Sequence, residues 1–343
     1  MSLRMPAEWE PHKGTWIAWP HLESDYPGKL DAVRWAYCEL VRHLCSREEV
    51  HVLCATDALE QDAQARMQRL SITGQISYHR AEYNRAWLRD SGPIGVTDTS
   101  SSQQVWAHFT FNGWGALPGF EHDQKIPAAV SELSKRPLST RISKWRESIL
   151  EGGMLDVNGE GLIMVTEECL LSPSQQRNAQ FTKSDYESLF AECLGATETI
   201  WVPFGIVGDD THGHIDNVAR FVNKDTVIVS TSIESDMEQY RRTSANYAFL
   251  KNFRTKTGSA LNIIELPLPV PRYCDGERLA CGYANFYLCN GAVLVPTFND
   301  IGDANALKTL AEVFPDREVI GIYCGDWILG GGALHCSTQQ EPL

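Results

Sequence analysis

The chain lacks basic character. Among its 343 residues, 30 lysines and arginines stand against 44 aspartates and glutamates, which gives a formal net charge of −14. Nucleic acids and anionic membranes bind proteins mainly through lysine and arginine, so we expect neither as a partner. An acidic surface suits a cationic substrate, although acidity also simply aids solubility.

Long apolar segments are lacking too. No apolar run approaches the roughly 18 residues that suggest a membrane-spanning helix. No basic-then-apolar leader opens the chain, and we interpret Met1-Ser2-Leu3, ahead of a second methionine at Met5, as a cloning remnant. These features predict a cytoplasmic protein.

Paired cysteine motifs are missing, although the chain holds ten cysteines. No two of them form a Cys-x-x-Cys pair, and a chain of this length needs no disulfides to stabilise a small core. We expect reduced thiols in a cytosolic protein. The cysteines stand at positions 38, 45, 54, 169, 193, 274, 281, 289, 324 and 336.

No low-complexity linker divides the chain, so the sequence predicts one α/β domain over 5–343 with many short strands. Apolar spacing and capping patterns predict helices over 29–46, 56–70, 124–135, 184–194, 236–256 and 304–313. Strands are expected over 14–19, 49–54, 75–79, 93–97, 105–111, 161–165, 168–171, 199–203, 218–222, 226–230, 261–265, 285–289, 292–295 and 318–323.

The segment before the C-terminus carries a strong sign of a site. The triplet Gly330–Gly332 lets the backbone approach a ligand closely, and His335 and Cys336 follow at once. Apolar residues just upstream, at 327–329, argue against a flexible tail. We predict a buried strand and turn over 327–337 that sets Cys336 at the floor of a site. The alternative is an inert core cysteine, since free cysteine is among the most buried residue types.

Two carboxylates sit beside turn-forming residues. Asp90 follows Trp87-Leu88-Arg89 and precedes a Gly-Pro turn, and it is either a solvated turn residue or, given its bulky neighbours, a buried acid. Glu151 stands before Gly152-Gly153. That pattern fits a plain hairpin or an acid held where a ligand meets the backbone.

The most polar stretch runs from Asp209 to Asn217. If the chain is extended there, His212, His214 and Asp216 alternate onto one face. Such a set suits a metal ion, and it equally suits a histidine acting as general acid and base beside a carboxylate that binds substrate. A structural loop is the third interpretation, and the residues alone leave all three open.

The polar motifs recur at similar intervals. Asp90 and Glu151 are 61 residues apart, Glu151 and His214 are 63 apart, and His214, Asn285 and Cys336 follow at intervals of 71 and 51. Divergent repeats that each deliver one loop to a shared centre would produce this spacing. Asn285 also has a structural interpretation, in which its amide satisfies buried backbone groups.

A cysteine, a histidine and three acids together favour a positively charged substrate. A cysteine–histidine pair performs covalent catalysis, but nearby carboxylates repel a thiolate and raise its pKa. A cation is needed to balance them. A guanidinium is planar, remains charged near neutral pH, and offers forked N–H donors that match carboxylates.

These motifs resemble the agmatine deiminase and bacterial peptidylarginine deiminase family, and the likeness runs from Met5 to Pro342. The resemblance implies the pentein fold, a five-bladed α/β propeller of ββαβ units around a central channel. It also implies a guanidine hydrolase without metal or other cofactor. The matching motifs are Met5-Pro6-Ala7-Glu8-Trp9-Glu10-Pro11-His12, Trp87-Leu88-Arg89-Asp90, Glu151-Gly152-Gly153, Gly213-His214-Ile215-Asp216-Asn217, Ala284-Asn285-Phe286-Tyr287 and Gly330-Gly331-Gly332 through His335-Cys336 to Gln340.

The resemblance also implies roles for the residues. Cys336 is expected as the nucleophile and His214 as the general acid and base. Asp90 and Asp216 are expected to bind the guanidinium, while Glu151 orients the histidine or adds to that binding. Further substrate-binding residues are expected at Trp87, Trp114 and Asn285.

Agmatine is the expected substrate, because the N-terminal motif matches the agmatine type and no secretion signal is present. The products would be N-carbamoylputrescine and ammonia, which suits polyamine synthesis. Peptidyl-arginine or free arginine is the alternative, because His212 differs from the acidic or small polar residue expected before Gly213. An amidinotransferase and a non-catalytic binding protein on the same fold also stay open, and a homo-oligomer is a possible assembly.

Overall fold

The structure is a computed structural model that describes residues 3–343, and a four-element unit recurs along it. A short antiparallel hairpin is followed by a helix, and then by a strand that pairs in parallel with the second strand of the hairpin. Parallel neighbours need such a crossover, because a tight turn can join only antiparallel strands.

Three units show this order completely. The first has β7 (Asp156–Val157), β8 (Leu162–Thr166), α6 (Lys183–Leu194) and β9 (Glu198–Val202). The second has β10 (Ala219–Phe221), β11 (Thr226–Thr231), α7 (Met237–Asn252) and β12 (Asn262–Pro267). The third has β15 (Tyr287–Cys289), β16 (Ala292–Thr297), α8 (Asp303–Val313) and β17 (Glu318–Tyr323).

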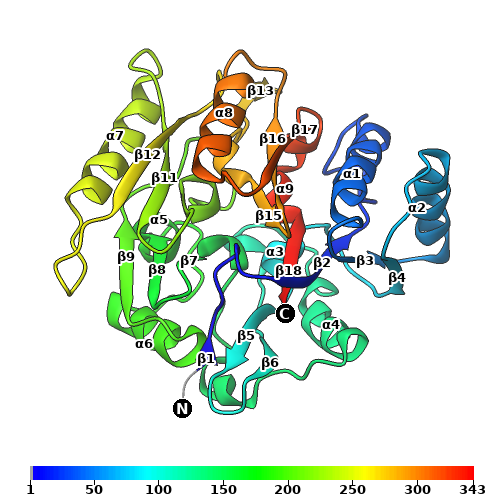
Figure 1. The fold of residues 1–343 in the computed structure, drawn as a ribbon, viewed down its shortest axis with the longest axis horizontal. Helices are drawn as coiled ribbons and strands as arrows, with labels where there is room; N and C mark the ends of the chain where they lie inside the picture. Colours follow the sequence, from blue (N-terminus) through cyan, green and yellow to red (C-terminus); the bar gives the residue numbers. More distant parts are fainter. Residues whose placement is uncertain (1–2) are drawn as a thin grey trace.

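A fourth unit joins the two ends of the chain. Its C-terminal strand β18 (Thr338–Pro342) pairs antiparallel with β2 (His12–Ala18), and β2 pairs in parallel with β3 (Glu49–Cys54). The connection is α1 (Leu30–Leu44), and α2 (Asp57–Arg69) leads to a further parallel strand, β4 (Ile76–Arg80). Figure 1 shows β18 and β2 side by side near the centre of the view.

The remaining sheet is an irregular version of the unit. It contains β1 (Leu3–Arg4), β5 (Ile94–Asp98) and β6 (Gln103–Ala107), all antiparallel, followed by α4 (Ile126–Ser134). A parallel bridge from Trp106 to Leu138 takes the place of the last strand. The short strands β13 (Tyr273–Cys274) and β14 (Glu277–Arg278) form a separate hairpin.

Five short helical turns each stand directly before a strand of the antiparallel pair in one unit. Each turn contacts the next along the chain, and the last contacts the first, so that they form a closed cycle. We call these five segments the turn ring. Figure 1 shows α3 and α9 near the middle of the molecule and the long helices toward its periphery. The turn ring consists of α3 (Leu88–Ser91), η4 (Gly152–Met154), η5 (Ile215–Asn217), η6 (Tyr283–Asn285) and α9 (Leu334–Ser337).

Two predicted elements are wrong. The strand expected over 168–171 is a helix, α5 (Glu167–Leu171), because the Thr166 hydroxyl caps it by accepting the Cys169 N–H. The segment 327–337 is buried as predicted, but it is helical, with η7 (Trp327–Gly330) followed by α9. Gly331 separates the two with a φ of 95°, a left-handed conformation that glycine adopts without steric cost.

The largest hydrophobic cluster connects the helix and strands of the fourth unit to β15 and β16, and it extends to Cys336. The predicted nucleophile therefore sits at the edge of a packed core and not on a loose tail. No helix formed by residues 3–343 is long and apolar enough to cross a membrane.

Candidate active site

The turn ring brings the predicted polar residues together. Every turn of the ring either contains a predicted polar residue or directly follows one. The intervals between these residues in the sequence are therefore the lengths of the structural units. In chain order the ring holds Asp90, Glu151, His214 with Asp216, Asn285, and Cys336.

Cys336 is held by a neighbouring amide. The Asn285 Nδ2 donates to Cys336 Sγ at 3.1 Å, and its Oδ1 accepts the backbone N–H groups of His335 and Cys336 at 3.1 and 3.4 Å. The Asp216 Oδ2 lies 3.6 Å from the sulfur. Asn285 thus satisfies buried backbone groups, as its structural interpretation expected, and also contacts the thiol.

The electrostatic environment keeps Cys336 protonated. Burial raises the pKa of the Cys336 thiol well above its ordinary value, and the negative charges of Asp216 and Asp90 raise it further. The hydrogen bond from Asn285 acts in the opposite direction but does not reverse the shift. A cation entering the site would lower the thiol pKa.

Asp90 is fixed from two sides. Its Oδ2 accepts the Trp114 indole N–H at 2.9 Å, and its Oδ1 accepts the backbone N–H of Gly153 at 3.0 Å. Trp114 belongs to the 3-10 turn η1 (Gly113–Gly115). Burial raises the pKa of Asp90 to about 6; His214 opposes this shift, and the negative charges of Glu151 and Asp216 add to it.

His214 is oriented by a buried ion pair. Its Nε2 lies 2.7 Å from the Glu151 Oε2, and Arg177 contacts both oxygens of that carboxylate, at 2.9 and 3.0 Å. Burial alone would raise the pKa of Glu151, but Arg177 and His214 lower it, so Glu151 stays ionised. Because Glu151 takes Nε2, the Nδ1 of His214 faces Asp90, whose Oδ1 is 3.8 Å away.

The charge on His214 follows from its neighbours. Burial alone would lower the pKa of the imidazole, but Asp90, Glu151 and Asp216 raise it to about 10. His214 is therefore an imidazolium at neutral pH. Its Nδ1 is buried and finds no hydrogen-bond partner within residues 3–343, which leaves one proton available to a bound molecule.

One carboxylate oxygen of Asp216 is hydrogen-bonded, and the other has no partner among the described residues. Its Oδ2 lies 2.8 Å from the Nδ1 of His335, whereas its Oδ1 is buried without a partner in the described part of the chain. Burial alone would raise the pKa of Asp216, but the hydrogen bond and charge of His335, together with the charges of His214 and Arg220, lower it.

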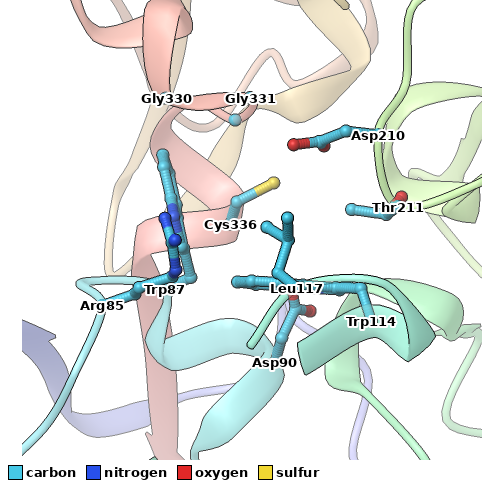
Figure 2. Close-up of a pocket in the computed structure, with 11 residues that line it drawn as sticks. Arg85, Trp87, Asp90, Trp114, Leu117, Asp210, Thr211, Gly330, Gly331 and Cys336 are labelled. Atoms are coloured by element: carbon cyan, nitrogen blue, oxygen red, sulfur yellow. The ribbon is translucent and has the colours of Figure 1, made fainter. Parts of the chain in front are cut away.

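A narrow pocket of about 50 Å³ reaches Cys336. Figure 2 shows the sulfur pointing into the space between Trp87 and the loop that carries Asp210 and Thr211. A Cβ atom on Gly331 would lie 2.5 Å from Asp210, so only glycine permits this approach. The lining comprises Arg85, Trp87, Asp90, Trp114, Leu117, Asp210, Thr211, the glycines at 330–332 and Cys336.

A wider outer pocket of about 620 Å³ adjoins the narrow one and shares Arg85, Leu117 and Asp210 with it. Burial, together with the charges of Asp209 and Asp90, raises the pKa of Asp210 to about 7, so this carboxylate titrates near neutral pH.

The prediction of an extended chain at His212 is wrong. His212 has a φ of 65°, and the following residues form the 3-10 turn η5, so His212, His214 and Asp216 do not alternate along a strand. The two Asp209 carboxylate oxygens hold this loop by accepting the backbone N–H groups of Thr211 and His214 at 3.0 Å each. No group of three or more His, Cys, Asp or Glu residues in the described chain is placed to hold a metal ion.

Four residues at the site carried no role in the sequence analysis. Arg177 stands in a loop and lies 26 residues from Glu151, so no local pattern connects them. Glu8 and His335 were noticed only within longer motifs, and Asp210 only as part of an acidic run. For these three residues, the best signal in the sequence was the position of His335 directly beside the candidate nucleophile Cys336.

The comparisons with known proteins cover nearly the whole chain. The family model described as Porphyromonas-type peptidyl-arginine deiminase matches residues 4–342. A protein named agmatine deiminase from Pseudomonas aeruginosa (strain LESB58) is 32% identical over 366 aligned positions, covering 99% of this chain and 96% of its own.

Solved structures give the same result. A C. jejuni agmatine deiminase, a cysteine-to-serine variant with substrate bound, superposes with a TM-score of 0.87 at 28% identity, covering 99% of this chain and 96% of its own. An agmatine deiminase of Enterococcus faecalis gives 0.88 at 25% identity with the same coverage. The mixed α/β fold described above is therefore the fold of these enzymes. The chain belongs to the agmatine deiminase and Porphyromonas-type peptidyl-arginine deiminase family.

Proposed function

We propose that this protein hydrolyses agmatine to N-carbamoylputrescine and ammonia through a covalent bond to Cys336. The observation that carries the proposal is a thiol enclosed by carboxylates, with Asp216 3.6 Å from the sulfur and Asp90 in the same pocket wall. Such a pocket favours a cation and disfavours a thiolate until the cation has bound.

In our account the guanidinium lies between Asp90 and Asp216. Its N–H groups donate to the free Oδ1 of Asp216 and to Asp90, which supplies the missing partner of a buried carboxylate oxygen. Trp87 and Trp114 flank the planar group as pocket walls. The positive charge lowers the pKa of Cys336, whose proton is released to solvent.

The first chemical step forms a carbon–sulfur bond. The Cys336 thiolate attacks the guanidinium carbon, and His214, an imidazolium at neutral pH, gives its proton to one amino group. The carbon–nitrogen bond breaks and ammonia leaves. The product is a positively charged thiouronium on Cys336 beside a neutral His214, which Glu151 keeps oriented.

The second step reverses the role of His214. The neutral imidazole takes a proton from water, and the resulting hydroxide attacks the thiouronium carbon. The carbon–sulfur bond breaks, and the hydroxyl proton passes to the departing sulfur. The ureido product leaves, and both the Cys336 thiol and the His214 imidazolium are restored.

The amine tail of agmatine is proposed to meet Asp210 at the mouth of the pocket. An α-carboxylate there would need a free cation, but Arg85 pairs with Asp25, and Arg278 pairs with Asp236 at 2.6 Å. This distribution of charge favours agmatine over free arginine. Peptidyl-arginine is the second candidate, because the adjoining pocket of about 620 Å³ is larger than a butylamine tail requires.

We further propose that the five units close as the blades of a pentein propeller, with the turn ring at its central channel. The closed cycle of contacts among the turns and the pairing of β18 with β2 support this arrangement. We propose a single catalytic domain over 5–343 in a cytoplasmic protein.

The proposal is tested by ammonia release from agmatine, free L-arginine and a blocked arginyl peptide, with Cys336→Ser as the control. We expect release from agmatine, lost in the variant. Release from the peptide alone would move the assignment to peptidylarginine deiminase. An absolute requirement for an added amine acceptor would indicate an amidinotransferase, and no release from any of the three would refute the proposed chemistry.

A further inference from the structure

A second histidine lies behind the pocket and contacts two acids. His335 is 2% exposed, and its ring nitrogens face carboxylates on both sides. Nδ1 lies 2.8 Å from the Asp216 Oδ2, and Nε2 lies 2.7 Å from the Glu8 Oε2. His335 does not line the pocket that reaches Cys336.

This geometry determines the charge of His335. A neutral imidazole has one N–H and one lone pair, so it could donate to only one of the two acids. Burial alone would raise the pKa of both acids, but cations other than His335 oppose it, because Arg220 lowers the pKa of Glu8, and His214 and Arg220 lower the pKa of Asp216. Both acids are therefore ionised, and only an imidazolium donates to both.

The far end of this chain of contacts is anchored to the fold. The Glu8 Oε2 accepts from Arg220 at 2.8 Å, and the Glu8 Oε1 accepts the Leu288 backbone N–H at 2.8 Å. Arg220 in turn pairs with Asp156 and donates to the carbonyl of Phe286 at 2.9 Å. Glu8 cannot swing toward the site without breaking these bonds, so it fixes the ring of His335.

We infer that His335, held by Glu8, is a positioning residue that keeps Asp216 ionised and reserves its Oδ1 for the guanidinium. The inference deepens the proposed function and rests on it. His335 occupies one oxygen of Asp216, so the other is left free. A cation beside Asp216 also offsets the charge that this acid places near the Cys336 sulfur.

Other charged groups also act on these residues, and all of them except His335 and Glu8 are unchanged in the variants below. Those facing Asp216 are His335 and Cys336 from α9, His214 from before η5, Arg220 from β10 and Asp90 from α3. Asp216 and Glu8 face the ring of His335, and the Arg89 guanidinium donates to the backbone carbonyl of His335.

The test compares His335→Asn and Glu8→Gln with His51→Asn. Asparagine retains a donor near the position of Nδ1 but removes the charge, and glutamine removes the charge that fixes the ring from behind. His51 is a matched control, because it is a buried histidine that contacts His79 and Trp16 instead of the site.

We expect the acid limb of kcat/KM for agmatine to change in His335→Asn. Without the cation the pKa of Asp216 rises, so one more proton binds on the acid side of the profile and the limb becomes steeper by one proton. Most of the loss falls on KM, because guanidinium binding is weakened. In Glu8→Gln the acid limb of kcat/KM changes in the same direction but less. In His51→Asn the acid limb stays that of the wild type, even if the substitution lowers Tm.

Nuclear magnetic resonance reports the charge of His335 independently of turnover. In ¹⁵N spectra of the substrate-free wild type, the His335 ring is identified as the signal that is lost in His335→Asn or shifted in Glu8→Gln. This ring should be doubly protonated at neutral pH, and a neutral ring overturns the inference whether or not any substrate is turned over. If His335→Asn does not fold, Glu8→Gln decides the question. An acid limb unchanged in midpoint and slope also overturns it, whereas a wild-type protein that releases no ammonia from any guanidine refutes the proposed function instead.

Discussion

Among single residues, the carboxylates of the candidate active site divide into two groups. Glu151 and Asp216 have positively charged partners that keep their pKa values low, whereas Asp90 and Asp210 have pKa values of about 6 and about 7. The second pair therefore takes up protons within a pH range that is easily measured. Each must be ionised to hold a cation.

We expect kcat/KM for agmatine to fall as the pH drops through about 7 and again through about 6, because Asp210 and then Asp90 lose their negative charge. Asp210→Asn should remove the decrease near pH 7, which we call the upper step. It should also raise KM for agmatine roughly tenfold or more, which is the effect of losing one charge-assisted hydrogen bond. Initial rates across the pH range measure both effects.

Two controls isolate the tail contact. n-Butylguanidine has no amine, so its profile should lack the upper step in the wild type. Glu277→Gln removes another acid of the outer pocket and should leave the agmatine profile unchanged. An upper step that persists in Asp210→Asn would contradict the proposed contact between Asp210 and the amine.

At the scale of elements, the site depends on five short turns and on how closely they approach. Gly153 in η4 shows this, because a Cβ atom there would lie 2.4 Å from the Nδ1 of His214 and 2.8 Å from the Oδ1 of Asp90. Backbone from one unit thus fills the space between catalytic candidates from two others. Only a residue without a side chain fits.

Gly153→Ala should therefore displace His214 and lower kcat by about 100-fold, the scale of loss expected from a shift of about 1 Å in a reacting group. The fold should survive, because the backbone at this glycine is not in the left-handed region. Gly282→Ala is the control, since its nearest neighbour would be 3.4 Å away. Near-normal turnover in Gly153→Ala would show that His214 is not held where the account requires.

The elements also show how far the sequence could lead. The helix expected over 184–194 is confirmed as α6, because the Thr182–Asp185 capping box and Gly195, with a φ of 76°, are local signals. The strand β18 was not predicted, since Thr-Gln-Gln-Glu-Pro has no apolar period. Its polar side chains are buried against distant partners, as when Gln340 accepts from Arg89 at 2.6 Å.

The same limit applies to the site. Cys336, His214 and the three acids each stand in a motif, so their types and intervals pointed to a shared centre. The contact of Glu8 with His335 spans 327 residues and leaves no local pattern. Such partners become visible only when the units are assembled.

At the scale of the whole molecule, one buried acid in β18 connects the two chain ends. Glu341 accepts from the Trp16 indole at 2.8 Å, and its other oxygen lies 3.3 Å from Arg136. Because β18 follows α9 directly, this contact also holds the segment that carries Cys336. The contacts of Glu341 therefore hold the two chain ends together and also fix the position of the nucleophile.

Glu341→Gln should lower the free energy of unfolding by about 3 kcal/mol, because it leaves the guanidinium of Arg136 buried without its counter-charge. Urea denaturation measures this. Glu318→Gln breaks a pair between the exposed Glu318 side chain and Arg47 and should cost less than about 1 kcal/mol. Equal losses in the two variants would contradict the role assigned to Glu341.

The proposed mechanism depends on a covalent bond between Cys336 and the guanidinium carbon. Intact-protein mass spectrometry of turnover quenched in acid tests it most directly, with wild type and Cys336→Ala treated alike. We expect an adduct equal to agmatine less ammonia on the wild type, mapped to Cys336 after digestion, and no adduct on the variant. An identical adduct on Cys336→Ala, or turnover by that variant, would contradict it.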